Sequence, residues 1–175
     1  MASTLVKIAV HIVFHIKTTS VIIRNSDIPL LHKYIGGIIR NVGSFPICVG
    51  GVDDHVHILC TLPKTMPLAD FVRTIKANSS RWIKLLSEYY NSFEWQTGYG
   101  AFSVSPSLMD KTELYITTQA EHHKKQTFED EYTLFLKAYL ILIMTLIACL
   151  KIDNNTIGVA PPKRATPNII FHSVC

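Results

Sequence analysis

Hydrophobic residues recur with two different periods along the chain. Residues 5–14 form a run rich in Val and Ile, which is typical of a β-strand. In residues 30–42 the apolar positions 31, 35, 38 and 39 share one face, which predicts a helix that ends at Gly43. The clearest helix covers residues 68–86, where positions 68, 71, 72, 75, 82, 83 and 86 form one continuous apolar face.

The remaining elements complete a known order. Two short strands are predicted at residues 45–49 and 55–62, a fourth strand at 101–105, and a third helix over 108–125. Strand, helix, strand, strand, helix, strand is the split βαβ or ferredoxin-like order, an α+β fold in which two helices cover one face of an antiparallel sheet. The opposite face is available for chemistry, although the fold by itself names no function.

Composition narrows the class of protein. The chain has 175 residues, of which 48% are hydrophobic and 17% charged, so a folded domain is expected and a disordered chain is excluded. The net charge is only +4, so nucleic-acid binding would depend on a local basic patch. Lys76, Arg81 and Lys84 lie largely off the apolar face of the helix over 68–86. They fit either a solvated surface or a stripe that contacts phosphates.

The number and spacing of the cysteines, and the length of the longest apolar segment, lead us to expect a cytoplasmic location. The four cysteines include no Cys-x-x-Cys pair and are too few for a disulfide scaffold, so reduced thiols are expected. The first residues lack the pattern of a signal peptide. The longest apolar run, residues 138–150, is shorter than the roughly 20 residues that cross a bilayer. We therefore expect a soluble cytoplasmic protein with no membrane partner.

The strand at residues 55–62 carries the first candidate site. Side chains alternate along a strand, and the even-numbered residues from 56 to 62 are all apolar, so they are expected to face the core. His55 and His57 then point together to the other face. Two imidazoles at this spacing can bind one divalent metal ion. The pattern alone also fits surface or hydrogen-bonded histidines.

The predicted helix over residues 108–125 carries the second candidate site. Tyr115 and Gln119 are four residues apart and lie on the same helical face. An activated tyrosine hydroxyl is a nucleophile, and a glutamine carbonyl oxygen is a hard ligand suited to Mg²⁺ or Mn²⁺. Taken alone, the pair also fits a tyrosine packed on the sheet and a surface glutamine. His123, one turn further, fits a metal ligand or a solvated helix end.

Together, His55-Val56-His57 and Tyr115-x-x-x-Gln119 resemble the single-tyrosine HUH transposases of small bacterial insertion sequences, and the related transposases that act on repetitive palindromic elements. The resemblance covers roughly residues 5–139, in order and at matching spacings. It also includes the connecting motif Trp95-Gln96-x-Gly98-Tyr99-Gly100. The stretches that carry it are residues 11–14, 31–35, 54–59, 75–80, 93–103 and 115–135.

The resemblance implies a role for each matching residue. Tyr115 matches the catalytic nucleophile, and His55, His57 and Gln119 match the ligands of a divalent cation, Mg²⁺ or Mn²⁺. Asp54 precedes the first histidine and fits either a carboxylate that orients the His55 ring or a plain turn residue. The implied reaction is cleavage and rejoining of single-stranded DNA at insertion-sequence ends through a 5′-phosphotyrosine link.

The resemblance also implies partners. The family recognises a hairpin formed by single-stranded DNA, which Lys76, Arg81 and Lys84 would contact. It works as a homodimer in which the tyrosine helix of one subunit can complete the site of the other, with residues 104–107 as the expected pivot. The protein would then act in the bacterial cytoplasm, on the nucleoid when bound to DNA. The alternatives are a domesticated or decayed hairpin-binding protein without strand transfer, and a metal- or RNA-binding domain with an accidental His-x-His.

The match to the family ends before the chain does. Residues 1–139 form the expected transposase domain, whereas residues 140–175 continue as an apolar run and a divergent tail that ends at Cys175. The tail fits either an extension packed on the dimer or the product of a shifted reading frame. It leaves the four catalytic positions unaffected.

Overall fold

The computed structural model describes residues 5–119 of the chain. They all belong to the first of two units, Met1–Lys124 and Lys125–Cys175. The last part of the third predicted helix, His123 and the expected domain boundary after residue 139 lie outside the described residues.

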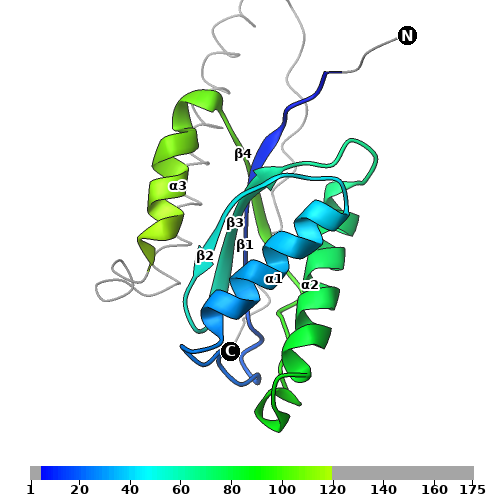
Figure 1. Ribbon diagram of the computed structural model, residues 1–175, viewed down its shortest axis with the longest axis vertical. Helices are drawn as coiled ribbons and strands as arrows, with labels where there is room; N and C mark the ends of the chain where they lie inside the picture. Colours follow the sequence, from blue (N-terminus) through cyan, green and yellow to red (C-terminus); the bar gives the residue numbers. More distant parts are fainter. Residues whose placement is uncertain (1–4, 120–175) are drawn as a thin grey trace, which may run out of the picture. The chain divides into compact units, whose positions relative to one another are not determined.

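A four-stranded sheet forms the centre of this unit (Figure 1). Its strands are β1 (Ala9–His15), β2 (Pro46–Gly51), β3 (His55–Thr61) and β4 (Gly100–Val104). They lie in the order β2-β3-β1-β4, and each neighbouring pair is antiparallel. β1 and β2 are therefore parallel with β3 between them, which confirms the predicted split βαβ, α+β fold.

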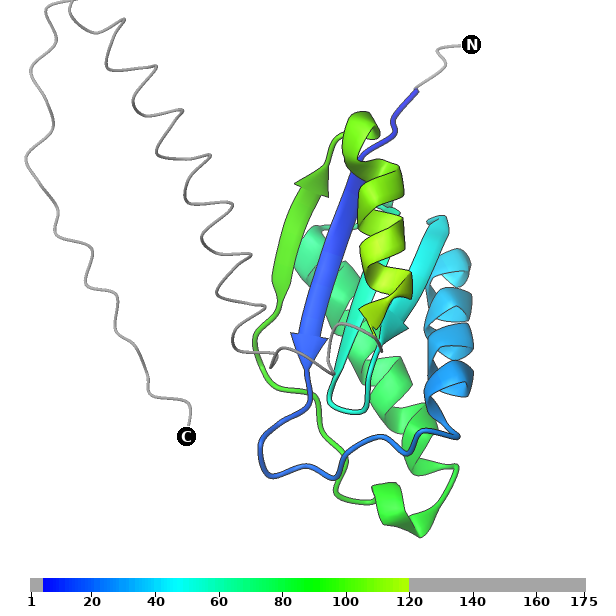
Figure 2. The ribbon, with the colours of Figure 1, turned by 90° about the vertical axis from the view of Figure 1, so that its left-hand side faces the viewer.

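Helices lie on both faces of the sheet. α1 (Ile28–Asn41) and α2 (Leu68–Lys84) lie on one face, and α3 (Met109–Thr117) lies on the other (Figure 1, Figure 2). Two short 3-10 helices, η1 (Glu88–Tyr90) and η2 (Pro106–Leu108), precede β4 and α3 respectively. Within the described residues, no helix has the length and apolar character needed to cross a membrane.

Some element ends differ from the prediction for identifiable reasons. β1 begins at Ala9 rather than at residue 5, because Thr61 and Val104, the last residues of its two neighbours, both pair with Ala9. α1 begins at Ile28, before the predicted start at residue 30, and includes a proline in its first turn. Proline is tolerated there because the backbone N–H that it lacks would have no partner within the helix. α1 ends as predicted before Gly43, whose φ of 78° lies in the left-handed region that glycine adopts without strain.

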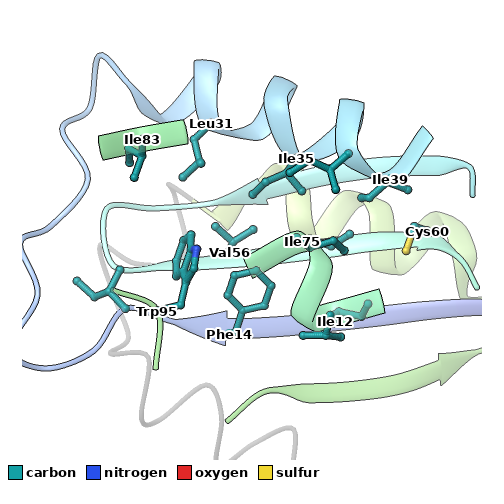
Figure 3. Close-up of a cluster of buried hydrophobic side chains, with 14 of the residues drawn as sticks. Ile12, Phe14, Leu31, Ile35, Ile39, Val56, Cys60, Ile75, Ile83 and Trp95 are labelled. Carbon is teal, nitrogen blue, oxygen red and sulfur yellow. The ribbon is translucent and has the colours of Figure 1, made fainter. Parts of the chain in front are cut away.

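The hydrophobic core lies between the sheet and the pair α1 and α2 (Figure 3). Val56, Ile58 and Cys60 of β3 point into it, as the alternation predicted, and Ile12 and Phe14 of β1 lie in the same cluster. All five side chains are fully buried. Because alternate residues of a strand point to opposite faces, this packing directs the odd-numbered residues of both strands toward the face that carries α3.

Trp95, from the motif before β4, belongs to this core. Its ring packs edge-on against Phe14 and Phe93 at centroid distances of 4.8 and 4.9 Å. Its indole N–H donates a hydrogen bond to the Ser79 hydroxyl oxygen at 3.0 Å. The aromatic motif therefore contributes apolar packing together with a satisfied polar atom.

We predict that Ile75→Ala in α2 lowers the free energy of unfolding by about 2–5 kcal/mol, because Ile75 is fully buried and its truncation leaves a cavity. Leu85→Ala is the control, since Leu85 is 80% exposed, and it should change the free energy by less than about 0.5 kcal/mol. Urea unfolding followed by circular dichroism measures both. Equal losses in the two variants would contradict this description of the core.

Candidate active site

Four histidines share the sheet face opposite the core. His11 and His15 come from β1, His55 and His57 from β3, and His15 pairs directly with His55 in the strand register. His11, His55 and His57 are each no more than 2% exposed. Alternation in β3 predicted the second pair, whereas the β1 pair was missed. The signal was present, because His11 and His15 are an even number of residues apart in a predicted strand and so share one face.

Asp54 connects two of these histidines. Its Oδ1 lies 2.6 Å from Nδ1 of His55, and its Oδ2 lies 3.1 Å from Nε2 of His15. The turn that carries Asp54 is tied to the end of β1, because the Ile16 amide donates to the Asp54 carbonyl at 2.8 Å. This geometry favours a role for Asp54 in orienting the His55 ring over that of a plain turn residue.

His11 contacts His57 on the same buried face. Nε2 of His11 lies 2.9 Å from Nδ1 of His57, and the rings stack with a centroid distance of 5.1 Å. In both His55 and His57, Nδ1 is therefore the nitrogen held by a neighbouring side chain. A metal ion would bind each ring through Nε2.

Burial and the Asp54 carboxylate set the charges of these groups. Burial lowers the pKa of His11 to about 4, so this ring is neutral at pH 7. Burial acts in the same direction on His15, but hydrogen bonds to Asp54 and to the Ile16 carbonyl outweigh it and raise the pKa of His15. Burial opposes ionisation of Asp54, yet hydrogen bonds from His15 and His55 hold its pKa well below the usual range. Asp54 is therefore a carboxylate at any pH at which the protein would act.

Gly50 of β2 allows α3 to approach the sheet closely. Gly50 pairs with His57 in the register. A Cβ atom at this position would overlap the backbone oxygen of Ile116 and lie 2.8 Å from its Cγ2. Ile116 itself is 1% exposed. Any larger residue at position 50 would therefore push α3 away from β2, the strand that pairs with β3 beside His57.

This packing brings Tyr115 to the histidine face. Its ring lies edge-on to that of His57, with a centroid distance of 5.7 Å, and 6.3 Å from that of His11. The Tyr115 hydroxyl is buried. One continuous helix was expected to carry both Tyr115 and Gln119, whereas α3 ends at Thr117 and Gln119 lies beyond it, after Thr118. Gln119 is nevertheless 1% exposed, and its Oε1 is buried.

The side chains on this face offer nitrogen and oxygen donors for a cation. Among residues 5–119, no three His, Cys, Asp or Glu side chains are grouped to hold a metal ion. The buried amide oxygen of Gln119 is a further oxygen donor that could complete a site with His55 and His57. Two imidazoles and one hard oxygen, with the remaining positions open to water or phosphate, are compatible with Mn²⁺ and Mg²⁺.

The three basic residues that were expected to contact DNA all lie on α2, across the sheet from the histidines. The Lys76 ammonium group binds backbone carbonyls within the protein: its Nζ donates to the carbonyls of Gln96 at 2.5 Å and Gly98 at 2.8 Å. Burial lowers the pKa of Lys76. Its ammonium group thus holds the loop before β4, and this geometry does not support the expected phosphate contact. Arg81 and Lys84 lie in the last turn of α2.

We predict that Gly50→Ala displaces α3, because the added methyl group would overlap the backbone of Ile116. Amide hydrogen exchange in residues 109–117 should accelerate at least about tenfold, while exchange in β1 and β3 stays slow. Gly37→Ala is the matched control: no atom lies within 4 Å of a Cβ atom at this position in α1. It should leave α3 protected and stabilise α1 by up to about 1 kcal/mol. Unchanged exchange in α3 of Gly50→Ala would contradict the inferred packing.

Comparisons with known proteins bear on the fold and on the family of the chain. The chain matches the family model of IS200-like transposases over residues 4–119. No curated protein sequence matches it. A crystal structure of a protein described as a transposase from Deinococcus radiodurans is 18% identical with a TM-score of 0.53, and the match covers 68% of this chain and 95% of that one. A REP-associated tyrosine transposase bound to a REP hairpin is 14% identical with a TM-score of 0.52, over 70% and 73% of the two chains.

At these identities the two structures support the fold. The match to the family model also identifies the family, because it spans more than half of the chain and all of the described residues, including the strands that bear the histidines and α3. The chain belongs to the IS200-like transposase family.

Proposed function

We propose that the protein cleaves and rejoins single-stranded DNA at the ends of an insertion sequence, with Tyr115 as the nucleophile. One observation carries this proposal: the Tyr115 ring lies 5.7 Å from the His57 ring, on a sheet face where His55 and His57 are both buried. A nucleophile beside a pair of side chains that can bind a metal ion suits metal-assisted phosphoryl transfer. Membership of a transposase family supports the reaction class.

Cleavage is a transesterification at phosphorus. The Tyr115 hydroxyl oxygen attacks the scissile phosphorus in line with the leaving 3′ oxygen. A bond forms between the tyrosine oxygen and phosphorus while the bond from phosphorus to the 3′ oxygen breaks, which leaves a 5′-phosphotyrosine link. The tyrosine loses one proton and the released 3′ oxygen gains one. Attack by a second 3′-hydroxyl reverses the step and joins new ends, so neither ATP nor water is consumed.

His55, His57 and Gln119 would hold the divalent cation, Mg²⁺ or Mn²⁺, through two Nε2 atoms and one Oε1. When bound, the cation supplies charge neutralisation at the phosphate oxygens. Asp54 accepts a hydrogen bond from Nδ1 of His55, at 2.6 Å, and so keeps the proton of that ring on Nδ1. Nε2 of His55 then carries the lone pair that a cation needs.

Hairpin DNA is the proposed substrate. One structural relative was solved bound to a REP hairpin. A hairpin flanked by single strand offers backbone phosphates and unpaired bases for recognition. Arg81 and Lys84, in the last turn of α2, are the proposed phosphate contacts. This recognition would occur in the bacterial cytoplasm, at the nucleoid.

A homodimer that exchanges α3 between its subunits is the proposed assembly. The connection from β4 to α3 is short and exposed over residues 105–108, which suits the pivot expected there. Leu114 of α3 is 64% exposed and Leu108 is 49% exposed. Leu108 of η2 and Leu114 of α3 thus expose apolar side chains that a second subunit could cover, which supports a dimer contact at this end of the chain segment.

We predict that the protein forms a covalent adduct with single-stranded DNA from the flanks of its own gene in the presence of Mg²⁺ or Mn²⁺. Tyr115→Phe should abolish the adduct because it removes the nucleophilic oxygen, and EDTA should abolish it because it removes the cation. A denaturing gel with labelled DNA measures the adduct. Tyr89→Phe is the matched control, since Tyr89 lies in η1 and its ring contacts the Arg24 guanidinium group.

The outcomes separate the two candidate activities. Loss of the adduct in Tyr115→Phe and in EDTA, with Tyr89→Phe unaffected, would support strand transfer. Hairpin binding without any adduct would favour a domesticated or decayed binding protein. An adduct that persists in Tyr115→Phe would contradict the assignment of the nucleophile.

We predict that the double variant Arg81→Gln, Lys84→Gln weakens hairpin binding. The negative slope of log K against log salt concentration should become shallower by about 1.4–1.8, because two phosphate contacts are lost. Fluorescence anisotropy across a salt series measures both quantities. Lys17→Gln is the control, because Lys17 is a lysine outside α2 whose ammonium group is paired with the Glu94 carboxylate at 2.7 Å. An unchanged slope in the double variant would mean that DNA binds to another surface.

A further inference from the structure

The structure assigns His11 a part in this site that rests on the proposed function: we propose that His11 is a positioning residue for His57. By accepting a hydrogen bond at its Nε2, His11 would keep the proton of His57 on Nδ1. Nε2 of His57 would then be the atom that binds the cation. His11 itself would touch neither the cation nor the DNA.

The contact between the two rings is direct and well defined. Nε2 of His11 lies 2.9 Å from Nδ1 of His57, which is an ordinary hydrogen-bond length. The rings are stacked with an interplanar angle of 26°, and both are at most 2% exposed. His57 pairs with Val13 in the register, so His11 lies diagonally across from it on the same face of two central strands. Neighbouring strands therefore hold both rings in place.

The direction of this hydrogen bond decides whether His57 can bind a metal. A neutral imidazole carries its proton on one nitrogen and a lone pair on the other. If His11 donated, the proton of His57 would sit on Nε2, and that nitrogen would have no lone pair for a cation. If His57 donates from Nδ1, Nε2 carries the lone pair. Metal binding by His57 therefore requires His11 to be the acceptor.

The two proposed ligand histidines thus differ in what holds them. His55 donates to the Asp54 carboxylate. The neighbour of His57 is another imidazole, and in the proposed tautomer His57 donates to it. A carboxylate at position 11 would add a second negative charge, this one buried, beside a site that has to accept a DNA phosphate. A neutral acceptor at position 11 orients the ligand without that repulsion. This difference explains why an imidazole, rather than an acid, is suited to this position of β1.

The packing around His11 suggests the variants for a test. Its ring lies 6.3 Å from that of Tyr115 and 6.4 Å from that of Phe102, so an aromatic replacement preserves most of the packing. His11→Phe removes the acceptor and keeps a ring. His11→Gln restores an acceptor, because its amide oxygen can accept the proton of His57. Tyr34→Phe is the control, since Tyr34 is an aromatic residue of α1 whose ring stacks on that of Trp82 in α2.

Calorimetric titration of the full 175-residue protein with Mn²⁺ provides the first measurement. His11→Phe should weaken Mn²⁺ binding about 10- to 100-fold, as loss of a side chain behind a metal ligand typically does, and His11→Gln should recover it to within about threefold of wild type. Tyr34→Phe should bind as wild type does. His57→Ala sets the level for loss of the ligand itself.

The ¹⁵N resonances of the His57 ring, recorded without metal, provide a second measurement that a purely structural role would not change. Wild type should carry the proton on Nδ1, and His11→Phe should shift it toward Nε2. An Nε2 proton in wild type, unchanged Mn²⁺ affinity in His11→Phe, or no recovery in His11→Gln would overturn the inference. The wild-type tautomer decides it even if His11→Phe does not fold.

The same experiment separates this inference from the proposed function. If wild type binds Mn²⁺, His57→Ala loses binding and His11→Phe keeps it, only the role of His11 fails. If wild type binds no Mn²⁺, the proposed metal site fails, and the role of His11 fails with it.

Discussion

The antiparallel pairing of β1 with β3 is the constraint on which the site and the core both depend. Its register sets His15 opposite His55 and brings His11 within hydrogen-bond distance of His57. The same register fills the other face with apolar residues such as Ile12. A slip by one residue would exchange the two faces and bury imidazoles in the core. Core packing and site geometry therefore favour one and the same register.

Local periodicity was sufficient for most of the fold. The alternation in β3 identified both its core side and its histidine side, and the period of α2 identified its buried face. Alternation in β1 was less informative, because a nearly continuous apolar run identifies a strand without saying which residues face its partner. His11 and His15 therefore became interpretable only when the pairing with β3 was known.

Contacts between distant segments could not be predicted in the same way. Gly50 falls just outside the strand predicted at residues 45–49, but it lies in β2, where the absence of a side chain lets Ile116 of α3 pack against it. Lys76 was expected to face DNA, but its ammonium group bonds to carbonyls of the loop before β4. In both cases the role of the residue depends on which backbone atoms of a distant segment lie close to it. The spacing of residues along the sequence does not indicate such tertiary contacts.

The proposed site places two metal-ligand histidines, Gln119 and the Tyr115 nucleophile on one buried face of the sheet. Paramagnetic broadening by Mn²⁺ in an NMR titration is a direct test of this placement. At substoichiometric Mn²⁺, we expect the side-chain resonances of His57, Tyr115 and Gln119 to disappear first, while that of the Trp82 indole on α2 persists. Broadening that begins at Trp82, or that spares Tyr115, would contradict a shared site on this face.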